Sequence, residues 1–399
     1  MGCCRASWRD SARAPAVVPM HAEIAGAGFG GLVAAIALAR RGWSVRVHER
    51  TPFVRSEGYG IAIHRNGILV LQALGAFDEI LQGSVRVSHL ETRRADGSLT
   101  SQVPARLTYR ISRQHMIGVL SRCAQQAGVE VLVDSEVDGA QPDGQLCLKD
   151  GTRLAADLVI GADGVHSRVR DSLDLLDRRS MLPDGAMRFV FQVDPGATGI
   201  DPVAGAPAIE YWSGSRRLIW NACAPDQIYV AMSCLASDAT GQQVPLDATS
   251  WQQAFPALAP QIARMAASVD WDSVKWVRFQ TIHLKRWSAG KVAVLGDAAH
   301  AMPPNLGQGG GCAMMNAWSL ANAVADAGSI PEALAAWEQR ERPLTEHTQR
   351  WSRMYSATTV WPAWMRSAAF FATGRVGWLR SQYQKTANHI PVGLRADAV

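Results

Sequence analysis

The sequence predicts an α/β fold with a second, mainly antiparallel-sheet domain and a helical C-terminal segment. Three observations support this class. A strand–turn–helix–strand unit occupies residues 21–49, two later apolar strands run directly into loops rich in Gly and Asp, and residues 185–283 change to short alternating strands separated by Pro, Gly and Asp. The first two are typical of an open parallel sheet, and the third is typical of an antiparallel sheet.

The composition is that of a globular protein with about two domains. The chain has 399 residues, of which 48% are hydrophobic and 19% charged, so global disorder is excluded. The net charge of +5 is scattered without a long basic run, which argues against a nucleic-acid-binding protein. The 7 cysteines include no C-x-x-C pair. We therefore expect neither a disulfide framework nor a metal site, and a reducing cytoplasm fits best.

We expect neither a membrane span nor a secretion signal from the sequence. No stretch approaches the ~18 uninterrupted apolar residues of a membrane span, so no integral membrane segment is expected. Residues 1–19 contain charges but lack the apolar core of a secretion signal. We expect them to form a disordered extension, with Met20 as a candidate start.

The first element is a βαβ unit with a glycine-rich turn. Residues 21–25 form a short apolar stretch, followed by Gly26-x-Gly28-x-x-Gly31, an apolar helical stretch and an alternating strand that ends before Glu49. In such a turn the first glycine makes the bend, the second lets a pyrophosphate approach the backbone, and the third allows close helix packing. Glu49 is placed to accept hydrogen bonds from ribose hydroxyls. The alternative is a glycine turn without a ligand and an exposed glutamate.

The remaining elements follow the same logic along the chain. Ser112 is a suitable N-cap for a helix over residues 113–128, which ends at a glycine and is followed by a strand over 129–133. Strands are predicted at residues 154–160 and 291–295, and each leads into a Gly/Asp loop, where open α/β sheets place ligands. Alternating strands are predicted at residues 188–193, 208–212, 217–220 and 227–232, a helix at 313–325, and another at 330–351.

Two of these loops carry extended motifs. The first is Asp157-Leu-Val-Ile-Gly-Ala-Asp163-Gly164-Val-His-Ser-Arg168, and the second is Gly296-Asp297-Ala-Ala-His300-Ala-Met-Pro303-Pro304-Asn-Leu-Gly307-Gln-Gly309-Gly310. Together with the glycine turn they resemble the paired motifs of the FAD-dependent aromatic hydroxylases, the p-hydroxybenzoate hydroxylase-like family of single-component flavoprotein monooxygenases. The resemblance spans roughly residues 21–345. It implies a Rossmann-like FAD-binding domain beside a substrate domain.

The resemblance also implies a set of FAD-binding residues. Asp297 would hold a ribityl hydroxyl, Arg113 would reach the pyrophosphate, and the Asp163 loop is associated with both FAD and NAD(P)H. The glycines from 307 onwards open a helix whose positive dipole end could face the flavin pyrimidine edge. A plain turn is the alternative there. The complete predicted set is Gly26, Gly28, Gly30, Gly31, Glu49, Arg50, Arg113, Val137, Asp163, Asp297, Gly307, Gly309 and Gly310.

The substrate pocket is harder to place from the sequence. Candidates are His64, which lies in a segment that passes close to the flavin in the family, Pro303, and the strand residues Trp212 and Trp220. His64 and the tryptophans have structural alternatives: a position on a surface loop for His64, and core packing, which is the default for a tryptophan. No catalytic residue is assigned.

The domain boundaries follow from the elements and the resemblance. The FAD-binding domain is expected to be discontinuous, over residues 20–90, 108–184 and 284–350. The substrate domain is expected over residues 91–107 and 185–283, and the C-terminal helical tail over 351–399.

The function that the resemblance implies is a monooxygenase. NAD(P)H would reduce FAD, O₂ would form a flavin hydroperoxide, and one oxygen atom would be transferred to an aromatic or related electron-rich small molecule. The sequence has no second G-x-G-x-x-G, so NADH or NADPH would act as a transient co-substrate. Two alternatives remain: another FAD reaction on this fold, such as an isoprenoid reductase or a halogenase-like enzyme, and a non-catalytic flavin-binding redox sensor. The chain could form a homodimer.

Overall fold

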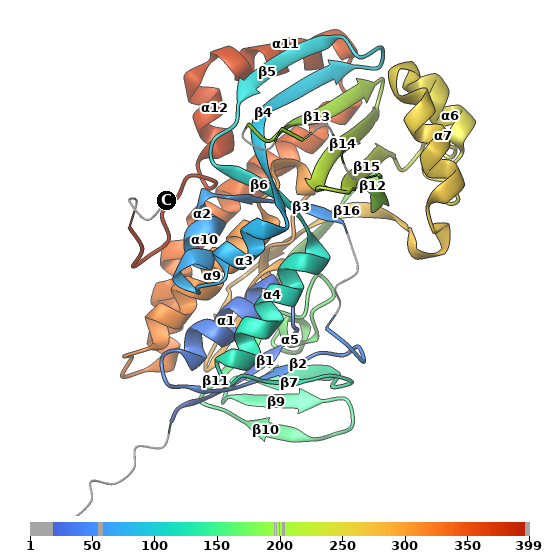
Figure 1. Ribbon diagram of the computed structural model, residues 1–399. Helices are drawn as coiled ribbons and strands as arrows, with labels where there is room; N and C mark the ends of the chain where they lie inside the picture. Colours follow the sequence, from blue (N-terminus) through green and yellow to red (C-terminus); the bar gives the residue numbers. More distant parts are fainter. Residues whose placement is uncertain are drawn as a thin grey trace, which may run out of the picture.

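The computed structural model describes residues 19–395, apart from residues 55–58, 195, 197, 199 and 202–203. The expected N-terminal extension, residues 1–19, lies outside the described residues except for Pro19. The predicted α/β class with a second, largely antiparallel sheet is confirmed (Figure 1). No helix within the described ranges is long and apolar enough to cross a membrane.

The lower part of the molecule in Figure 1 is built on a mostly parallel sheet. Among the described residues, six strands form it in the order β17–β18–β11–β1–β2–β7, and only the β17–β18 pair is antiparallel. Their bounds are β1 His21–Ala25, β2 Ser44–His48, β7 Glu130–Leu132, β11 Leu158–Gly161, β17 Ser288–Ala289 and β18 Val292–Val294. A small antiparallel sheet lies below it, formed by β8 Val137–Gln141, β9 Gln145–Leu148 and β10 Arg153–Ala155.

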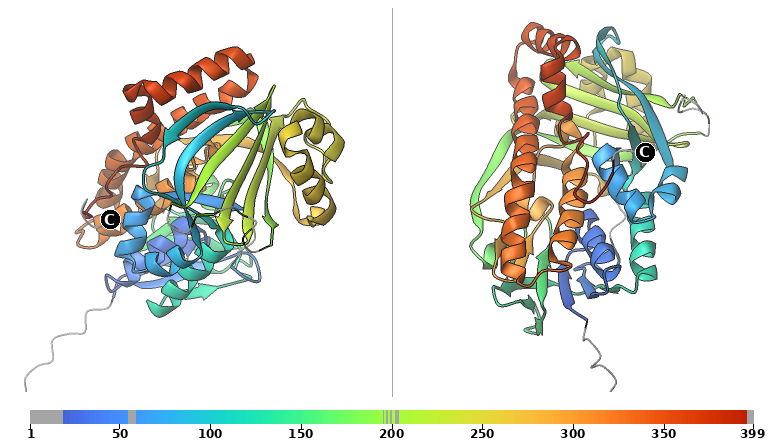
Figure 2. Two further views of the ribbon diagram at one scale, coloured as in Figure 1. Left: turned by 45° about the horizontal axis from the view of Figure 1, so that its top comes forward. Right: turned by 90° about the vertical axis from the view of Figure 1, so that its left-hand side faces the viewer.

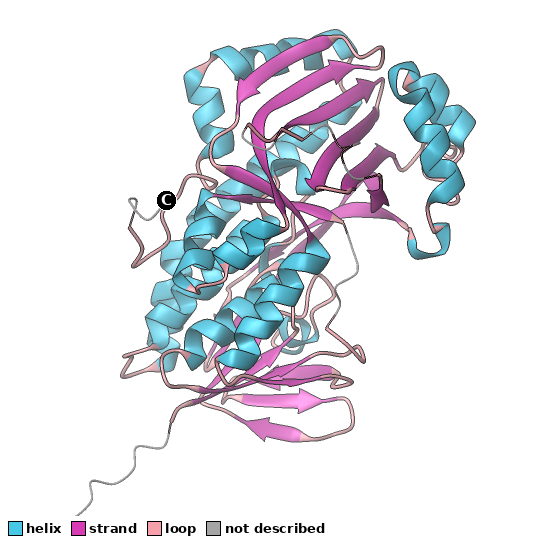
Figure 3. Ribbon diagram, in the orientation of Figure 1, coloured by secondary structure: helices cyan, strands magenta, loops and turns pink. Residues whose placement is uncertain are grey.

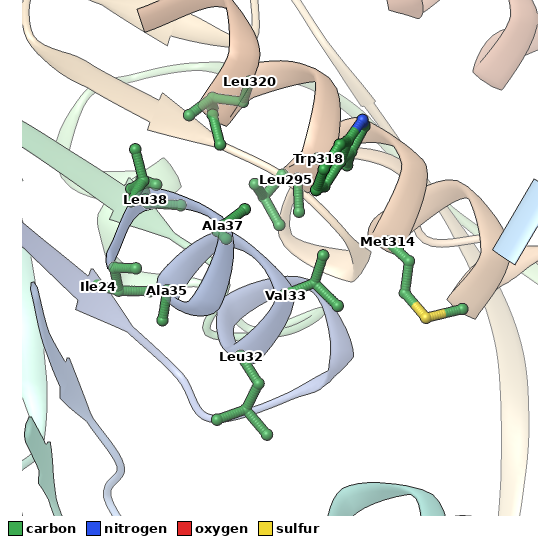
Figure 4. Close-up of a cluster of buried hydrophobic side chains, with 14 of the residues drawn as sticks. Ile24, Leu32, Val33, Ala35, Ala37, Leu38, Leu295, Met314, Trp318 and Leu320 are labelled. Atoms are coloured by element: carbon green, nitrogen blue, oxygen red, sulfur yellow. The ribbon is translucent and has the colours of Figure 1, made fainter. Parts of the chain in front are cut away.

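Helices pack beside the parallel sheet and bury its apolar residues. The helices in this part are α1 Phe29–Ala39, α2 Arg65–Ala73, α3 Phe77–Gln82, α4 Arg113–Gln126, α5 Arg168–Ser172, α8 Asp297–His300, α9 Gly309–Val324 and α10 Ile330–Ala357. Helix α1 is apolar on every side because it lies between α4 and α9. Figure 4 shows Val33 of α1 near Leu295 and Met314, all buried in one core. The glycine turn is therefore held on a rigid base.

The upper part is one large sheet. Its strands follow the order β16–β12–β15–β14–β13–β4–β6–β3, with β5 paired to β4. The bounds are β3 Gly60–His64, β4 Ser84–Arg94, β5 Leu99–Pro104, β6 Thr108–Ser112, β12 Leu176–Gln192, β13 Ala206–Ser213, β14 Arg216–Ala224, β15 Gln227–Leu235 and β16 Trp276–Leu284. Strands β3 and β6 therefore come from segments that the sequence assigned to the FAD-binding part.

The two faces of the large sheet have different neighbours. Helices α6 Ala248–Ala254 and α7 Ala259–Ser268 lie against one face, which we call the outer face (Figure 3). Leu218 of β14 packs there with Trp251 of α6. Cys223 and Tyr229 point to the opposite, inner face, where they pack with Tyr59. Alternate residues of a strand point to opposite sides, so the sheet separates a packed core from an inner surface.

The C-terminal helices run alongside the large sheet. Helix α10 spans much of the molecule, and α11 Ala363–Arg375 and α12 Gly377–Gln384 follow it (Figure 2). Helix α11 contacts β5, at the far edge of the upper part from the glycine turn.

Two predicted strands differ from the structure, and two helices were not predicted. The single strand expected at residues 154–160 is two strands, β10 and β11, in different sheets, and Asp157 between them accepts a hydrogen bond from the backbone N–H of His21 at 2.8 Å. Strand β12 begins at Leu176, earlier than predicted. Helices α6 and α7 were not predicted, because their short apolar pattern resembles that of the surrounding strands. The helix after Ser112 is confirmed, and the Ser112 hydroxyl accepts from the His115 N–H at 3.3 Å.

Candidate active site

The glycine turn is shaped by close backbone contacts. Gly26 has a φ of +99°, and a Cβ there would lie 2.5 Å from the carbonyl oxygen of Ala162. A Cβ on Gly31 would lie 2.0 Å from the carbonyl oxygen of Gly26. No other residue fits either position. Gly28 is different, because a Cβ there would meet no atom within 4 Å. The chain thus leaves open space in front of Gly28, at the N-terminus of α1.

Glu49 lies beside this turn at the end of β2. One of its carboxylate oxygens accepts a hydrogen bond from the Ala27 N–H at 3.2 Å, and the other accepts from the Thr51 hydroxyl at 2.8 Å. The carboxylate is only partly buried. Arg50 follows as an exposed residue, and the Val137 side chain is buried in the core at the start of β8.

The N-termini of two further helices converge on the same place. Arg113 begins α4, and its guanidinium lies 5.5 Å from the centre of the Phe29 ring in the first turn of α1. A Cβ on Gly310, in the first turn of α9, would lie 3.5 Å from that ring. The starts of α1, α4 and α9 are therefore neighbours. Because a helix N-terminus carries unpaired N–H groups and a positive partial charge, this arrangement favours a phosphate-bearing ligand.

Asp297 lines an interior hollow. It is the first residue of α8 and follows Gly296, whose φ is +64°. Burial raises the pKa of Asp297, and the nearby Arg188 and Arg113 partly offset that shift. The side chain is nonetheless exposed. A carboxylate that is both deep in the protein and exposed faces a hollow, where it could accept a hydrogen bond from a bound hydroxyl group.

The turn before α9 provides a second open backbone surface. Gly307 has a left-handed φ of +61° and Gln308 is the N-cap of α9. A Cβ on Gly309 would meet no atom within 4 Å. Gly28 and Gly309 thus border open space at the N-termini of α1 and α9. Open space at both helix ends is what an extended dinucleotide requires.

Two of the predicted cofactor residues have structural contacts of their own. A Cβ on Gly30 would lie 2.5 Å from the Leu295 side chain, so this glycine allows α1 to pack closely. One oxygen of Asp163 accepts from the backbone N–H groups of Arg168 and Val169 at 2.7 and 3.2 Å, which fixes the start of α5. Its other oxygen is buried and has no partner among the described residues.

The candidate substrate residues do not all lie together. A Cβ on Gly307 would lie 3.2 Å from His64 Nε2, so His64 borders the turn before α9. Pro303 begins that turn, where its carbonyl accepts from the Ser352 hydroxyl at 2.5 Å. Trp220 lies on the outer face against Phe191, 5.8 Å between ring centres. Trp212 packs against Phe370 of α11, farther along the sheet.

The residues that line the inner face opposite the turn were not predicted from the sequence. A Cβ on Gly60 would lie 2.5 Å from Tyr229, and the Arg188 guanidinium lies 3.8 Å from the centre of the Tyr59 ring. Arg110 of β6 is also on this side. We use the name chamber for the region where the inner face lies opposite the turn 303–307. The strands carrying these residues were recognisable, but which face of each strand would point inward was not.

Comparison with known proteins identifies the family. The model of the FAD binding domain family matches residues 20–352. The chain belongs to the family of FAD-dependent aromatic hydroxylases. It is an FAD-dependent monooxygenase that takes its electrons from NAD(P)H.

Relatives and solved structures cover nearly the whole hydroxylase. A putative 2-heptyl-3-hydroxy-4(1H)-quinolone synthase from Rhodococcus erythropolis is 37% identical over 381 residues, 94% of this chain and 97% of the relative. A 2-heptyl-3-hydroxy-4(1H)-quinolone synthase from Mycobacteroides abscessus is 39% identical over 89% of this chain and 95% of its own. The structure of 2-methyl-3-hydroxypyridine-5-carboxylic acid oxygenase, in its tetrameric form, superposes with a TM-score of 0.83 at 34% identity, covering 94% of this chain and 98% of that one.

Replacing Asp297 with alanine tests the hollow at α8. We expect FAD to be held more weakly, by about tenfold or more in its dissociation constant, because a charged hydrogen-bond acceptor is lost. The fold should be unchanged, since Asp297 makes no hydrogen bond to another described side chain and its own side chain is exposed. Fluorescence titration of the apoprotein with FAD measures this. Wild-type affinity in the Asp297→Ala variant would show that the ribityl chain lies elsewhere.

Proposed function

We propose that this monooxygenase hydroxylates a nitrogen-containing aromatic ring that bears a hydroxyl or oxo group, held in the chamber. The names of the relatives support this class, because quinolone and hydroxypyridine rings share these features. The observation that carries the proposal is that aromatic residues of the inner face, Tyr59 and Tyr229, lie on the side of the sheet that faces the turn before α9.

The same geometry suggests how the chain holds FAD. The open backbone at Gly28 would accommodate the pyrophosphate, Glu49 the adenosine ribose, and Asp297 the ribityl chain. Arg113, at the start of α4, would neutralise phosphate charge. The flavin supplies electron transfer and activation of O₂ when it is bound. Its pyrimidine edge would face the N-terminus of α9, whose positive end favours negative charge at that edge.

The chamber residues would position the ring and exclude water. Tyr229 is nearly fully buried on the inner face, and the Tyr59 ring lies 6.4 Å away from it between ring centres. Flat aromatic walls of this kind suit an aromatic ligand. An enclosed site also limits the access of solvent to a reactive centre.

A comparison of ring types tests the proposed substrate class. Hydroxypyridines and 4-quinolones should stimulate NAD(P)H oxidation by the FAD-loaded enzyme and yield products heavier by one oxygen atom. Carbocyclic phenols of the same size serve as controls and should stimulate at least about tenfold less, a difference of about 1.4 kcal/mol. Mass spectrometry of each mixture identifies the products. Oxygenation of the phenols alone would overturn the proposed ring class without affecting membership of the family.

Assembly and compartment are proposed from separate observations. We propose a homo-oligomer, with a homodimer as the smallest unit; the related pyridine oxygenase is described as tetrameric. We also propose a cytoplasmic location, because the cysteines in the described part of the chain are free and suit a reducing compartment. Light scattering on the purified protein tests the first proposal.

A further inference from the structure

Helix α11 presents an aromatic face to the outside of the protein. Its inner side is fixed by Arg366, which is buried with its guanidinium 4.4 Å from the centre of the Trp212 ring, and by Phe370, which packs 5.9 Å from the same ring. Trp364 and Phe371 lie on the other side, with exposed fractions of 74% and 50%. The exposed residues that share this side at helical spacing are Trp364, Ala368, Phe371 and Arg375.

The beginning of α12 continues this exposed surface. Val376 and Trp378 follow directly after α11 and have exposed fractions of 45% and 64%, although one edge of Trp378 packs against Trp351 of α10. Trp364 and Trp378 are the most exposed large apolar side chains among the described residues. Helices α11 and α12 lie at the periphery of the upper part (Figures 1 and 2). We call the surface formed by Trp364, Ala368, Phe371, Arg375, Val376 and Trp378 the C-terminal face.

The charge around the C-terminal face is of one sign. Residues 347–395 contain seven Lys or Arg and no Asp or Glu. The guanidinium of Arg375 lies 4.3 Å from the centre of the Phe371 ring, so a positive charge belongs to the face itself, and Lys385 is exposed just beyond α12. The last acidic residue before this segment, Glu346, is paired with Arg342 at 2.6 Å. Exposed aromatic rings are thus combined with positive charge alone.

This combination favours an anionic partner over a second copy of the chain. A two-fold contact between copies would bring the same face of both subunits together, so Arg375 and Lys385 would meet like charges without an acidic residue between them. An anionic lipid bilayer complements both properties. Trp and Phe side chains insert at the level of the lipid headgroups, and Lys and Arg are attracted to anionic headgroups.

We propose that the C-terminal face docks the protein on the surface of an anionic lipid bilayer. Helix α11 has 13 residues, too few to span a bilayer, so it would lie in the plane of the membrane surface. Trp364, Phe371 and Trp378 would enter the headgroup region, and Arg375 would lie beside lipid phosphates. The glycine turn is at the far end of the molecule from α11, so docking leaves the proposed FAD site free (Figure 1). This contact goes beyond the proposed function and does not depend on which ring the enzyme accepts.

Co-sedimentation with vesicles tests the membrane contact. The FAD-loaded protein is mixed with vesicles of phosphatidylcholine and phosphatidylglycerol in equal parts, or with vesicles of phosphatidylcholine alone. The wild type should bind the anionic vesicles at least about tenfold more tightly, and added salt should weaken this binding because ions screen the attraction. Trp364→Ser/Trp378→Ser should lose at least about tenfold in affinity for the anionic vesicles. Arg375→Gln/Lys385→Gln should lose the preference for them over the neutral ones.

The matched control is Met181→Ser/Val277→Ser, which removes two apolar side chains, each 48% exposed, from β12 and β16. It should bind both kinds of vesicle like the wild type. The flavin content and the rate of NAD(P)H oxidation should be unchanged in every variant, which reports correct folding.

Three results would overturn the membrane contact: binding to neither kind of vesicle, equal binding to both, or anionic binding that survives Trp364→Ser/Trp378→Ser. Light scattering identifies the alternative occupant. A wild-type oligomer that ignores vesicles and dissociates in the double tryptophan variant would show that the C-terminal face joins copies of this chain, and would likewise overturn the proposal.

Discussion

Replacing Gly28 with valine is expected to give a folded, colourless protein that retains no FAD. A Cβ at this position meets no protein atom within 4 Å, so the fold should tolerate the side chain. The side chain would instead fill the open space at the N-terminus of α1, where the pyrophosphate must approach the backbone. The flavin absorbance of the purified protein and its circular dichroism spectrum measure the two effects separately.

Gly377→Val is the matched control for this change. Gly377 also begins a helix, α12, and a Cβ there likewise meets nothing within 4 Å. Its variant should be as yellow as the wild type. A Gly28→Val protein that retains a full complement of FAD would show that the dinucleotide does not lie against this turn.

The second large effect is expected on the rate of flavin reduction. A bound substrate should accelerate reduction by NAD(P)H at least about tenfold, corresponding to about 1.4 kcal/mol of activation free energy. The turn 303–307 borders the chamber and directly precedes the N-terminus of α9. Arg217 of the large sheet donates to Asn305 of this turn at 2.8 Å, so the roof of the chamber and the turn are linked. A ligand in the chamber can therefore influence the position where the flavin is expected.

The sequence also gives a reason for such control. It contains no second G-x-G-x-x-G, so no separate domain would hold the nicotinamide cofactor. If the flavin were reduced without substrate, NAD(P)H would be consumed and O₂ would be reduced to hydrogen peroxide. Stopped-flow absorbance with and without the true substrate measures the rate. Benzene, which can fill the substrate site without making polar contacts, is the control for occupancy of the site alone. Equal rates in all three mixtures would show that the enzyme lacks substrate control of reduction.

The FAD-binding part could be predicted because its signals are local. Gly26, Gly31 and Glu49 lie within one βαβ unit, and the contact of Gly31 with the Gly26 carbonyl follows from the path of a single turn. The cap at Ser112 is local as well. Gly30 shows the limit of this reasoning, because its contact with Leu295 depends on a strand far along the chain.

The chamber could not be predicted in the same way, because it is formed by side chains that only the tertiary structure brings together. Trp220 and Tyr229 both lie on alternating strands, yet Trp220 packs on the outer face and Tyr229 on the inner one. An arginine in an alternating strand is ordinarily read as solvent-facing. Arg110 is instead partly buried, because β6 pairs with β3 and because the large sheet folds over the turn before α9.

The most direct test of the account follows the oxygen atom. The FAD-loaded enzyme is supplied with NAD(P)H, isotopically labelled O₂ and the heteroaromatic ring that binds most tightly, and the product is analysed by mass spectrometry. We predict one labelled oxygen atom in the hydroxylated ring for each NAD(P)H consumed. Oxidation of NAD(P)H that yields only peroxide with every ring tested, or a product that is altered without labelled oxygen, would contradict the assignment of this chain as an aromatic-ring monooxygenase.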